Sequence, residues 1–356
     1  MALALRLLAP RNTETQTQVP ALRIVAGLLV RWSPNRIAFA DLQGYSVLLY
    51  LLSQSELSFE LFEILFEIAT HGEDTPSRRG SLKDPLCTLL ITDLLPLCAP
   101  PLQRKILRAI EDSLLRSPAS ATRLWMETPG LGLPILLNFM RTMASSLYTV
   151  LLAVLSQMAP LWGAQELEQL CMFVIGDQQA AIEGKGQILE LVNQRLSSRN
   201  MNIEVLRSVG GWDLALCFLD HRDECIRVGG IHTLGLLLED PKATKTFSKK
   251  GGWEAARRVL TSHPVSAAGC VAMLQLSLGH LGFEDSLPVE GGRRVVIHPG
   301  ALEVLISMVG ACTQEQEELQ CTTLTTVEML AEDRGNVMTL LGAGALDWMR
   351  GILFAG

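Results

Sequence analysis

A phrase of apolar and small residues recurs along the chain: a bulky apolar residue, a glycine, an aromatic residue or alanine, then an apolar run. Its copies carry their last glycines at 44, 130, 211, 252, 300 and 344, and the clearest are Gly210-Gly211-Trp212 and Gly251-Gly252-Trp253. The successive spacings are 86, 81, 41, 48 and 44 residues. Since the first two are about twice the others, one period of roughly 40–47 residues fits every copy, which is typical of armadillo and HEAT repeats.

Between these glycines the apolar positions follow a helical period. In segment 58–69, three phenylalanines, a leucine and an alanine share one face, while three glutamates form a second stripe. No alternation typical of strands persists for more than a few residues. Helices are predicted over 21–31, 45–52, 58–69, 86–95, 101–115, 134–142, 146–159, 165–175, 184–196, 202–209, 213–219, 224–238, 299–309, 314–332 and 337–341.

The predicted fold class is all-α, an armadillo/HEAT-like right-handed α-solenoid superhelix. We expect residues 1–20 to form a terminal segment or partial helix, with a loop over 10–20. Residues 21–356 form a single solenoid of about seven to eight repeats, with mobile loops near 71–83 and 279–292. The repeat has a physical logic, because glycine closes a helix in the left-handed conformation and one unit cannot bury its apolar face alone. The alternative is that glycines and apolar helices recur by chance in a leucine-rich and glycine-rich chain.

Composition excludes several classes of protein. The chain of 356 residues is 48% hydrophobic and 19% charged, so it can bury a large core. Its net charge of -7 gives no overall electrostatic footprint for nucleic acid. The eight cysteines include no Cys-x-x-Cys pair and indicate buried, reduced thiols in a cytoplasmic protein rather than disulfides or a metal site.

One segment raises a membrane alternative. Residues 142–165 carry no formal charge, so an integral membrane protein with a span at 142–165 is a third hypothesis. The segment also contains serines, glutamine and Pro160, which favour a buried solenoid helix over 146–159 that ends at the proline. The expected localisation is cytoplasmic, with peripheral attachment to membranes left open.

The stretch from Leu219 to Trp253 is the most particular in the chain. It combines a charged turn at 220–223, Ile226-Arg227, a Leu-Gly-Leu-Leu-Leu helix at 234–238 and the entry Lys-Lys-Gly-Gly-Trp at 249–253. This pattern resembles the armadillo-like α-solenoid of neurobeachin-type BEACH-domain proteins, and segment 39–52 looks like an earlier unit of that region. The resemblance spans residues 20–350. It implies a very large cytoplasmic scaffold in vesicle trafficking, membrane remodelling or autophagy, of which this chain is a fragment without the BEACH and WD40 modules.

Motifs for catalysis and cofactor binding are missing from the sequence. It contains no Walker A motif, His-Glu-x-x-His or nucleophile elbow. Segment 342–347 begins like a dinucleotide loop, but it has no third glycine and no preceding strand. His221, Cys225 and His232 have helical spacing, yet no second pair completes a metal site. We therefore expect no enzyme activity, no catalytic or metal-binding residues and no cofactor.

A basic island interrupts this acidic chain. The segment from Lys242 to Arg258 contains six basic residues and a single acidic residue, Glu254. The functional interpretation is a docking patch for an acidic partner or anionic lipid headgroups; the alternative is a solvated helix end and an outer helix face. The candidate docking residues are Lys245, Lys249, Lys250, Arg257 and Arg258.

The function predicted from these observations is a non-enzymatic scaffold that binds other proteins through its solenoid surface, with an anionic membrane surface as a further candidate partner. Nucleic acid and small-molecule substrates are not expected. The alternative function is a generic armadillo/HEAT adaptor for transport or assembly, which ladders of exposed Asn and Trp would indicate. Trp212, Trp253 and Trp348 instead lie at repeat glycines, a position that suggests packing.

Overall fold

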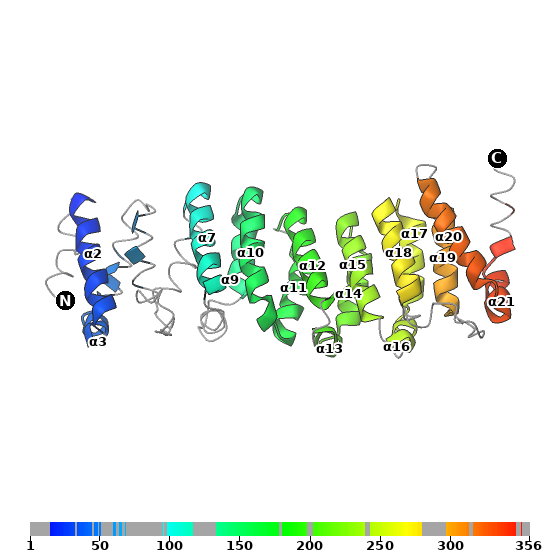
Figure 1. Ribbon diagram of the computed structural model, residues 1–356, viewed down its shortest axis with the longest axis horizontal. Helices are drawn as coiled ribbons and strands as arrows, with labels where there is room; N and C mark the ends of the chain where they lie inside the picture. The colour runs from blue at the N-terminus through cyan, green and yellow to red at the C-terminus, as the bar shows by residue number, and fades with distance from the viewer. Residues whose placement is uncertain are drawn as a thin grey trace. The chain divides into compact units, whose positions relative to one another are not determined.

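The computed structural model is built from helices, and its described residues contain no β-strand (Figure 1). The all-α fold class predicted from the sequence is therefore confirmed. The predicted mobile loops near 71–83 and 279–292 lie outside the described residues, except for Gly279, which ends a helix. The structure describes residues 15–32, 34–44, 46–48, 50, 60–61, 64–65, 68, 95, 98–116, 133–177, 180–197, 202–238, 243–279, 297–312, 316–346 and 350.

The chain divides into two compact units, of which the first comprises residues 1–161 with 179–181. Within it, α2 packs against α3, and α10 packs against α7 and α9. Leu22 of α2, Leu107 of α7 and Leu151 of α10 are completely buried, as the apolar face of each helix requires. Its helices are α2 (Thr15–Arg31), α3 (Pro34–Asp41), α7 (Pro100–Arg116), α9 (Leu133–Thr142) and α10 (Tyr148–Met158), with 3₁₀ turns at Ser145–Leu147 and Ala159–Leu161.

The second unit comprises residues 162–178 and 182–356. It is a series of short helices, most of them 7 to 14 residues long. They are α11 (Ala164–Gly176), α12 (Ile182–Ser197), α13 (Asn202–Ser208), α14 (Gly211–Leu219), α15 (Glu224–Leu237), α16 (Ala243–Lys249), α17 (Gly252–Ser262), α18 (Ala267–Gly279), α19 (Pro299–Ala311), α20 (Glu317–Leu330) and α21 (Arg334–Gly342).

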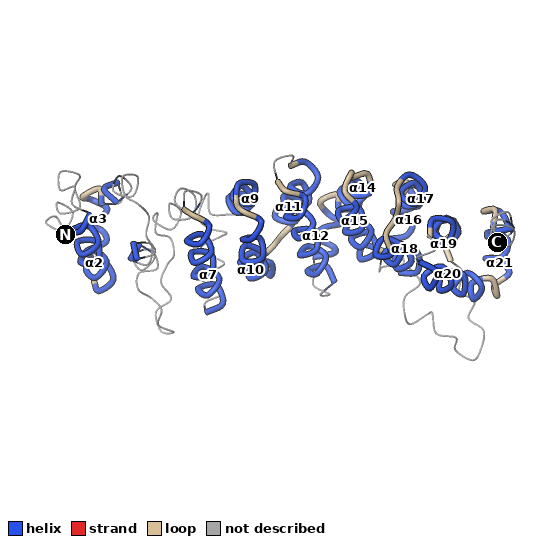
Figure 2. Tube along the Cα trace, turned by 90° about the horizontal axis from the view of Figure 1, so that it is seen from above, coloured by secondary structure: helices blue, strands red, loops and turns tan. Residues whose placement is uncertain are grey.

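The helices of the second unit stack in two rows (Figure 2). One row runs through α11, α14, α17 and α19, and the other through α12, α15, α18 and α20, each helix packing on the next. The short helix α13 precedes α14, and the short helix α16 precedes α17. The repeats are thus residues 202–238, 243–279 and 297–330. This layered stacking is solenoid-like, as predicted; the handedness of a superhelix and a single array over 21–356 remain predictions.

The recurring glycine pair makes the turn between the first and second helix of a repeat. Gly210 and Gly251 cap α14 and α17 with φ of 79° and 71°, in the left-handed region that glycine enters without steric cost. The next residues, Gly211 and Gly252, begin those helices and leave no room for a side chain. A β-carbon on Gly252 would overlap the Phe247 ring of the preceding helix. The two glycines therefore have different roles, which the sequence pattern did not separate.

Other copies of the phrase place the left-handed residue and the glycine in close contact at different positions. In the first unit Gln43 takes the left-handed conformation, with φ of 54°, and a β-carbon on Gly44 would overlap Phe39. At the last copy Gly344 is the left-handed residue, with φ of 82°, and corresponds to Gly251 rather than to Gly252. Aligning the copies by their last glycine therefore places this copy one residue out of register with the others. The copy at Gly130 lies outside the described residues.

Several helix bounds differ from the prediction. The loop expected over residues 10–20 is wrong for 15–20, because α2 begins at Thr15 and contains Pro20. Pro20 has a helical φ but lies beyond the first turn of α2, so the helix lacks one backbone hydrogen bond there. No range was predicted for the helices α3, α16, α17 and α18. Helix α18 has no charged residue and α16 has only seven residues, so neither shows a clear amphipathic period.

The proposed membrane span is divided among several elements. Residues 142–165 contain the end of α9, two 3₁₀ turns, the 11-residue helix α10 and the start of α11. Among the described residues, no helix has both the length and the apolarity that crossing a membrane requires. Helix α10 lies inside the predicted buried helix 146–159, and its residues Leu151, Val154 and Leu155 are fully buried.

Candidate interaction surface

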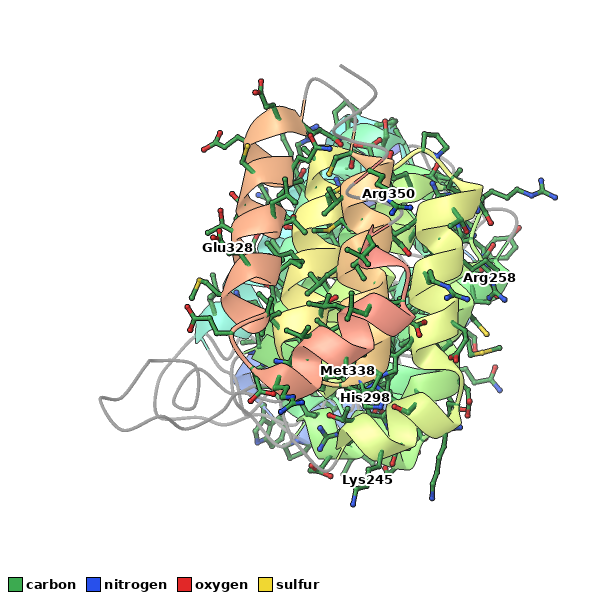
Figure 3. The ribbon with its side chains drawn as sticks, turned by 90° about the vertical axis from the view of Figure 1, so that its right-hand side faces the viewer. Lys245, Arg258, His298, Glu328, Met338 and Arg350 are labelled. Carbon is green, nitrogen blue, oxygen red and sulfur yellow. The ribbon has the colours of Figure 1, made fainter. Side chains whose placement is uncertain are left out.

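The five candidate docking residues all lie in the repeat 243–279, and all are exposed. Lys245 and Lys249 are on α16, Lys250 follows it, and Arg257 and Arg258 are on α17. Figure 3 shows Lys245 at the lower edge of this repeat and Arg258 well away from it on the right-hand side. The basic island of the sequence is therefore spread over two sides of the repeat.

Three of the five residues form ion pairs with the neighbouring repeats. Lys250 Nζ lies 2.7 Å from each carboxylate oxygen of Asp213, and Arg258 Nη2 lies 2.8 Å from Asp220 Oδ1. Both acids belong to the repeat before. Arg257 Nη1 lies 3.1 Å from Glu303 Oε2 in the repeat after. These partially exposed pairs each contribute about 0–1 kcal/mol. They connect adjacent repeats and neutralise the charges of three of the five candidate docking residues.

Lys245 and Lys249 remain as the uncompensated part of the island. They lie four residues apart on α16, hence one above the other on the same helix face. Both are exposed, and no ion pair to either is found among the residues that the structure describes. Lys242 lies outside the described residues. A docking role for the island remains a prediction, and these two lysines are where it is best tested.

Beside the lysines, an aromatic cluster links three successive repeats. The rings of Trp212 and Phe247 have centroids 5.8 Å apart, and Phe247 meets Trp253 edge-on at 4.8 Å. Trp253 in turn stacks on His298 with centroids 5.5 Å apart. Trp212 and Trp253 are 5% and 4% exposed, so they pack, as their position at repeat glycines suggested, and do not form a ladder of exposed tryptophans.

His298 is the polar member of this cluster, and its hydrogen bonds identify its tautomer. Its Nδ1 accepts the backbone N–H of Gly300 at 3.1 Å and so caps α19. Nδ1 is therefore unprotonated, and Nε2 donates to Ser248 Oγ at 3.0 Å. The same hydroxyl accepts Trp253 Nε1–H and donates to the Thr244 carbonyl. The Ser248 hydroxyl thus makes one donor and two acceptor hydrogen bonds, which is its full capacity. Neutral His298 thus joins the repeat 297–330 to the repeat before it.

The stability of this junction is expected to depend on pH. Protonation would place a hydrogen on Nδ1, facing the N–H of Gly300, and the cap would be lost. Burial lowers the pKa of His298, although the carboxylates of Glu254 and Glu303 act in the opposite direction. Since the folded pKa lies below the ordinary value of about 6.5, the stabilisation is complete above about pH 6.5 and is lost as the pH falls through the folded pKa.

The measurement compares wild-type protein with His298→Asn from about pH 8 to about pH 5. Asparagine keeps an N-cap acceptor but does not titrate. Burial also lowers the pKa values of His221 and His232, and both residues remain in the variant, so their contribution cancels. The wild type should lose free energy of unfolding more steeply on acidification. Parallel curves for the two proteins would remove His298 from the explanation.

Of the histidines and cysteine with helical spacing, His221 takes part in the turn before α15, whereas His232 is exposed. His221 Nδ1 accepts the backbone N–H of Asp223, and Asp223 caps α15 by accepting from the N–H of Cys225. Burial raises the pKa of Cys225 to about 12, so its thiol is a poor ligand at neutral pH. Within the described part of the chain, no three histidine, cysteine or acidic side chains gather in a way that could hold a metal ion.

Residues that carry the family resemblance also have structural explanations. Arg227 is 5% exposed, and its guanidinium donates to the carbonyls of His221 and Arg222 at 3.0 and 2.7 Å, which fixes the charged turn before α15. Further along α15, Thr233 donates to Asn193 Oδ1 at 2.7 Å and ties α15 to α12. Asn193 is therefore buried and paired, unlike an asparagine exposed for binding.

Sequence reasoning missed two features of this surface. It did not connect His298 with Ser248 and Trp253, because these residues are 50 and 45 positions apart from it. The separation is close to one repeat length, which is the available signal: residues one period apart stack. It also missed that three cations of the island pair with Asp213, Asp220 and Glu303, which lie 37, 38 and 46 residues from their partners.

Comparisons with known proteins assign no family to the chain. No family model matches it, and no curated protein matches it. Among solved structures, the chain is similar to an engineered protein from the Northeast Structural Genomics Consortium at 14% identity, covering 99% of this chain and 94% of the other. The TM-score of 0.42 is too low to support an argument about function. The resemblance to the neurobeachin-type solenoid therefore remains a prediction from the sequence.

Proposed function

We propose that this chain is a non-enzymatic scaffold that binds other proteins through the surface of its stacked helices. The observation that supports the proposal is the stacking of the repeats 202–238, 243–279 and 297–330. Each repeat uses its inward residues to hold its neighbours, which leaves outward residues of successive helices side by side over a long surface. Such a surface suits an extended partner that contacts several repeats at once.

The face of α16 that carries Lys245 and Lys249 is the proposed contact for an acidic segment of a partner. These lysines form no ion pair among the described residues, whereas Lys250, Arg257 and Arg258 are paired with acids of the neighbouring repeats. Charge on the rim of an interface chiefly accelerates association and makes it sensitive to salt. We therefore expect binding through this face to weaken as ionic strength rises.

The test is a pull-down with quantitative mass spectrometry that compares wild-type protein, Lys245→Glu/Lys249→Glu and Arg257→Gln/Arg258→Gln. Partners that dock on α16 should be lost with the lysine variant at unchanged circular dichroism, and retained with the arginine variant, which breaks only the pairs to Glu303 and Asp220. Equal recovery with all three proteins would refute the lysine patch. Recovery of no protein above a matched helical control would refute the scaffold.

A place in a BEACH-type protein of vesicle trafficking, membrane remodelling or autophagy is the more specific form of this proposal. It rests on the stretch from Leu219 to Trp253. The generic armadillo/HEAT adaptor is the alternative, and the identity of the recovered partners distinguishes the two. Flotation with vesicles that contain phosphatidylserine tests attachment to an anionic membrane, where the same two lysines should matter.

A further inference from the structure

Large apolar side chains gather on the surface of α20 and α21. Among the described residues of the second unit, seven large apolar side chains are exposed, and four of them lie between positions 329 and 346. The other three are single residues on three different helices. Isolated apolar residues are usual on protein surfaces, whereas a cluster of them marks a site of contact.

Helix α21 presents a mixed stripe of side chains to solvent. Arg334, Met338 and Leu341 are all exposed and lie at i, i+4 and i+7, hence on one face of the helix. Leu346, just beyond the helix, is exposed as well. Figure 3 shows Met338 in the foreground on α21, with Glu328 of α20 to its left. These five residues and Glu332 define the α20–α21 face.

The register of the repeats shows that the apolar residue at 338 is specific to α21. Met338 lies six residues before a left-handed glycine, Gly344. In the repeats that begin with α13 and α16, the same position holds Glu204 and Lys245, which are charged and exposed. Those helices keep a solvated side chain there, whereas α21 has a methionine that is 65% exposed. Repetition of the fold alone does not explain an apolar residue at this position.

The residue two positions after the left-handed glycine is a point of contact in other repeats. It is Trp212 in one repeat and Trp253 in the next, and each is covered by a ring of the following repeat, Phe247 or His298. At the same position Leu346 is 54% exposed. The α20–α21 face thus exposes a position that packs protein against protein elsewhere in the chain.

Both signs of charge border the apolar centre of the α20–α21 face. Glu328 and Glu332 are exposed four residues apart at the end of α20, and Arg334 begins α21. No ion pair of these three side chains is found among the described residues. The acids disfavour an anionic lipid surface as the occupant. A second copy of the chain is complementary, because a two-fold axis brings the same patch against itself and sets acid against base.

We propose that the chain forms a homodimer in which its α20–α21 face packs against the same face of a second copy. The two-fold axis brings the apolar side chains of Met338, Leu341 and Leu346 in the two copies together. Each Arg334 then meets the acidic border of the other copy. Burial of the apolar centre supplies the affinity, and the charged border sets the pairing and its dependence on salt. This contact uses none of the residues proposed above to bind a partner through α16.

Sedimentation velocity of the full chain, from low to high micromolar concentrations, measures the dimer. The wild type should shift from monomer to dimer over this range. Met338→Glu/Leu341→Glu should weaken the dimer by at least about tenfold at unchanged circular dichroism, because it places charge at the centre of the contact. Met172→Glu/Ile182→Glu is the matched control: it also changes two exposed apolar residues, outside the face, and should dimerise as the wild type does.

An exchange of charges tests the two-fold pairing. Glu328→Arg/Glu332→Arg makes the charged border wholly basic, and Arg334→Glu makes it wholly acidic, so each variant alone should dimerise less than the wild type. An equimolar mixture of the two should form a heterodimer, because a basic border then meets an acidic one. Lys245→Glu/Lys249→Glu should dimerise like the wild type, which separates this contact from the proposed function.

Any of four results would overturn the proposal. The wild type could remain monomeric at the highest micromolar concentrations, or the variant at 338 and 341 could dimerise as well as the wild type. Assemblies could grow beyond the dimer, which indicates head-to-tail association in place of a two-fold contact. The mixture of charge variants could also form no more dimer than its components do alone.

Discussion

Replacing Phe247 by alanine is expected to lower the free energy of unfolding of the second unit by about 3–5 kcal/mol. The ring is 0% exposed and lies between Trp212 of the preceding repeat and Trp253 of its own, at 5.8 and 4.8 Å. It also fills the space that the missing side chain of Gly252 leaves. Truncation therefore removes buried apolar surface and opens a cavity at the point where two repeats meet.

Urea denaturation followed by circular dichroism measures this effect. Phe247→Leu keeps much of the volume and should cost less than the alanine variant. Met329→Ala is the surface control, because Met329 is 62% exposed and its truncation should change stability by less than about 0.5 kcal/mol. A loss below about 1 kcal/mol for Phe247→Ala would contradict the central role of the ring.

Much of the helical framework could be predicted, because its signals are local. The predicted helices 101–115, 134–142 and 165–175 agree with α7, α9 and α11 within about two residues. Apolar period, glycine and proline all lie within one element, so they act without knowledge of its neighbours. Helix α18 shows the limit: with no charged residue, its sequence gives no contrast between an inner and an outer face.

The candidate site was predicted less well, because charge pairing depends on positions one repeat apart. Lys250 belongs to a basic run in the sequence, yet in the fold it meets Asp213 from the preceding repeat. His298 appeared isolated, yet it completes a hydrogen-bonded group with Ser248 and Trp253. A sequence window shorter than the repeat cannot reveal either contact. Alignment of the chain with itself at the repeat period would have brought these residues together.

Replacing Gly252 by alanine is the second change with a large expected effect on stability. The sign of the change in the free energy of unfolding tests whether the glycine is needed for packing. In an ordinary helical position this exchange stabilises by roughly 0.5–1 kcal/mol, because glycine loses more conformational freedom on folding. At Gly252, however, a β-carbon would overlap the Phe247 ring, which is itself held between two tryptophans and cannot withdraw. We therefore expect a loss of about 1–3 kcal/mol from overpacking.

Gly235 supplies the matched control for this exchange. It lies within α15, and a β-carbon there meets no atom within 4 Å, so Gly235→Ala should raise the stability that Gly252→Ala lowers. The double variant Gly252→Ala/Phe247→Ala should cost less than the sum of its parts, because alanine at 247 vacates the space that the new β-carbon needs. Opposite signs for the two single variants, with this non-additivity, would show that the repeated glycine is required for close packing; equal signs would reject that role.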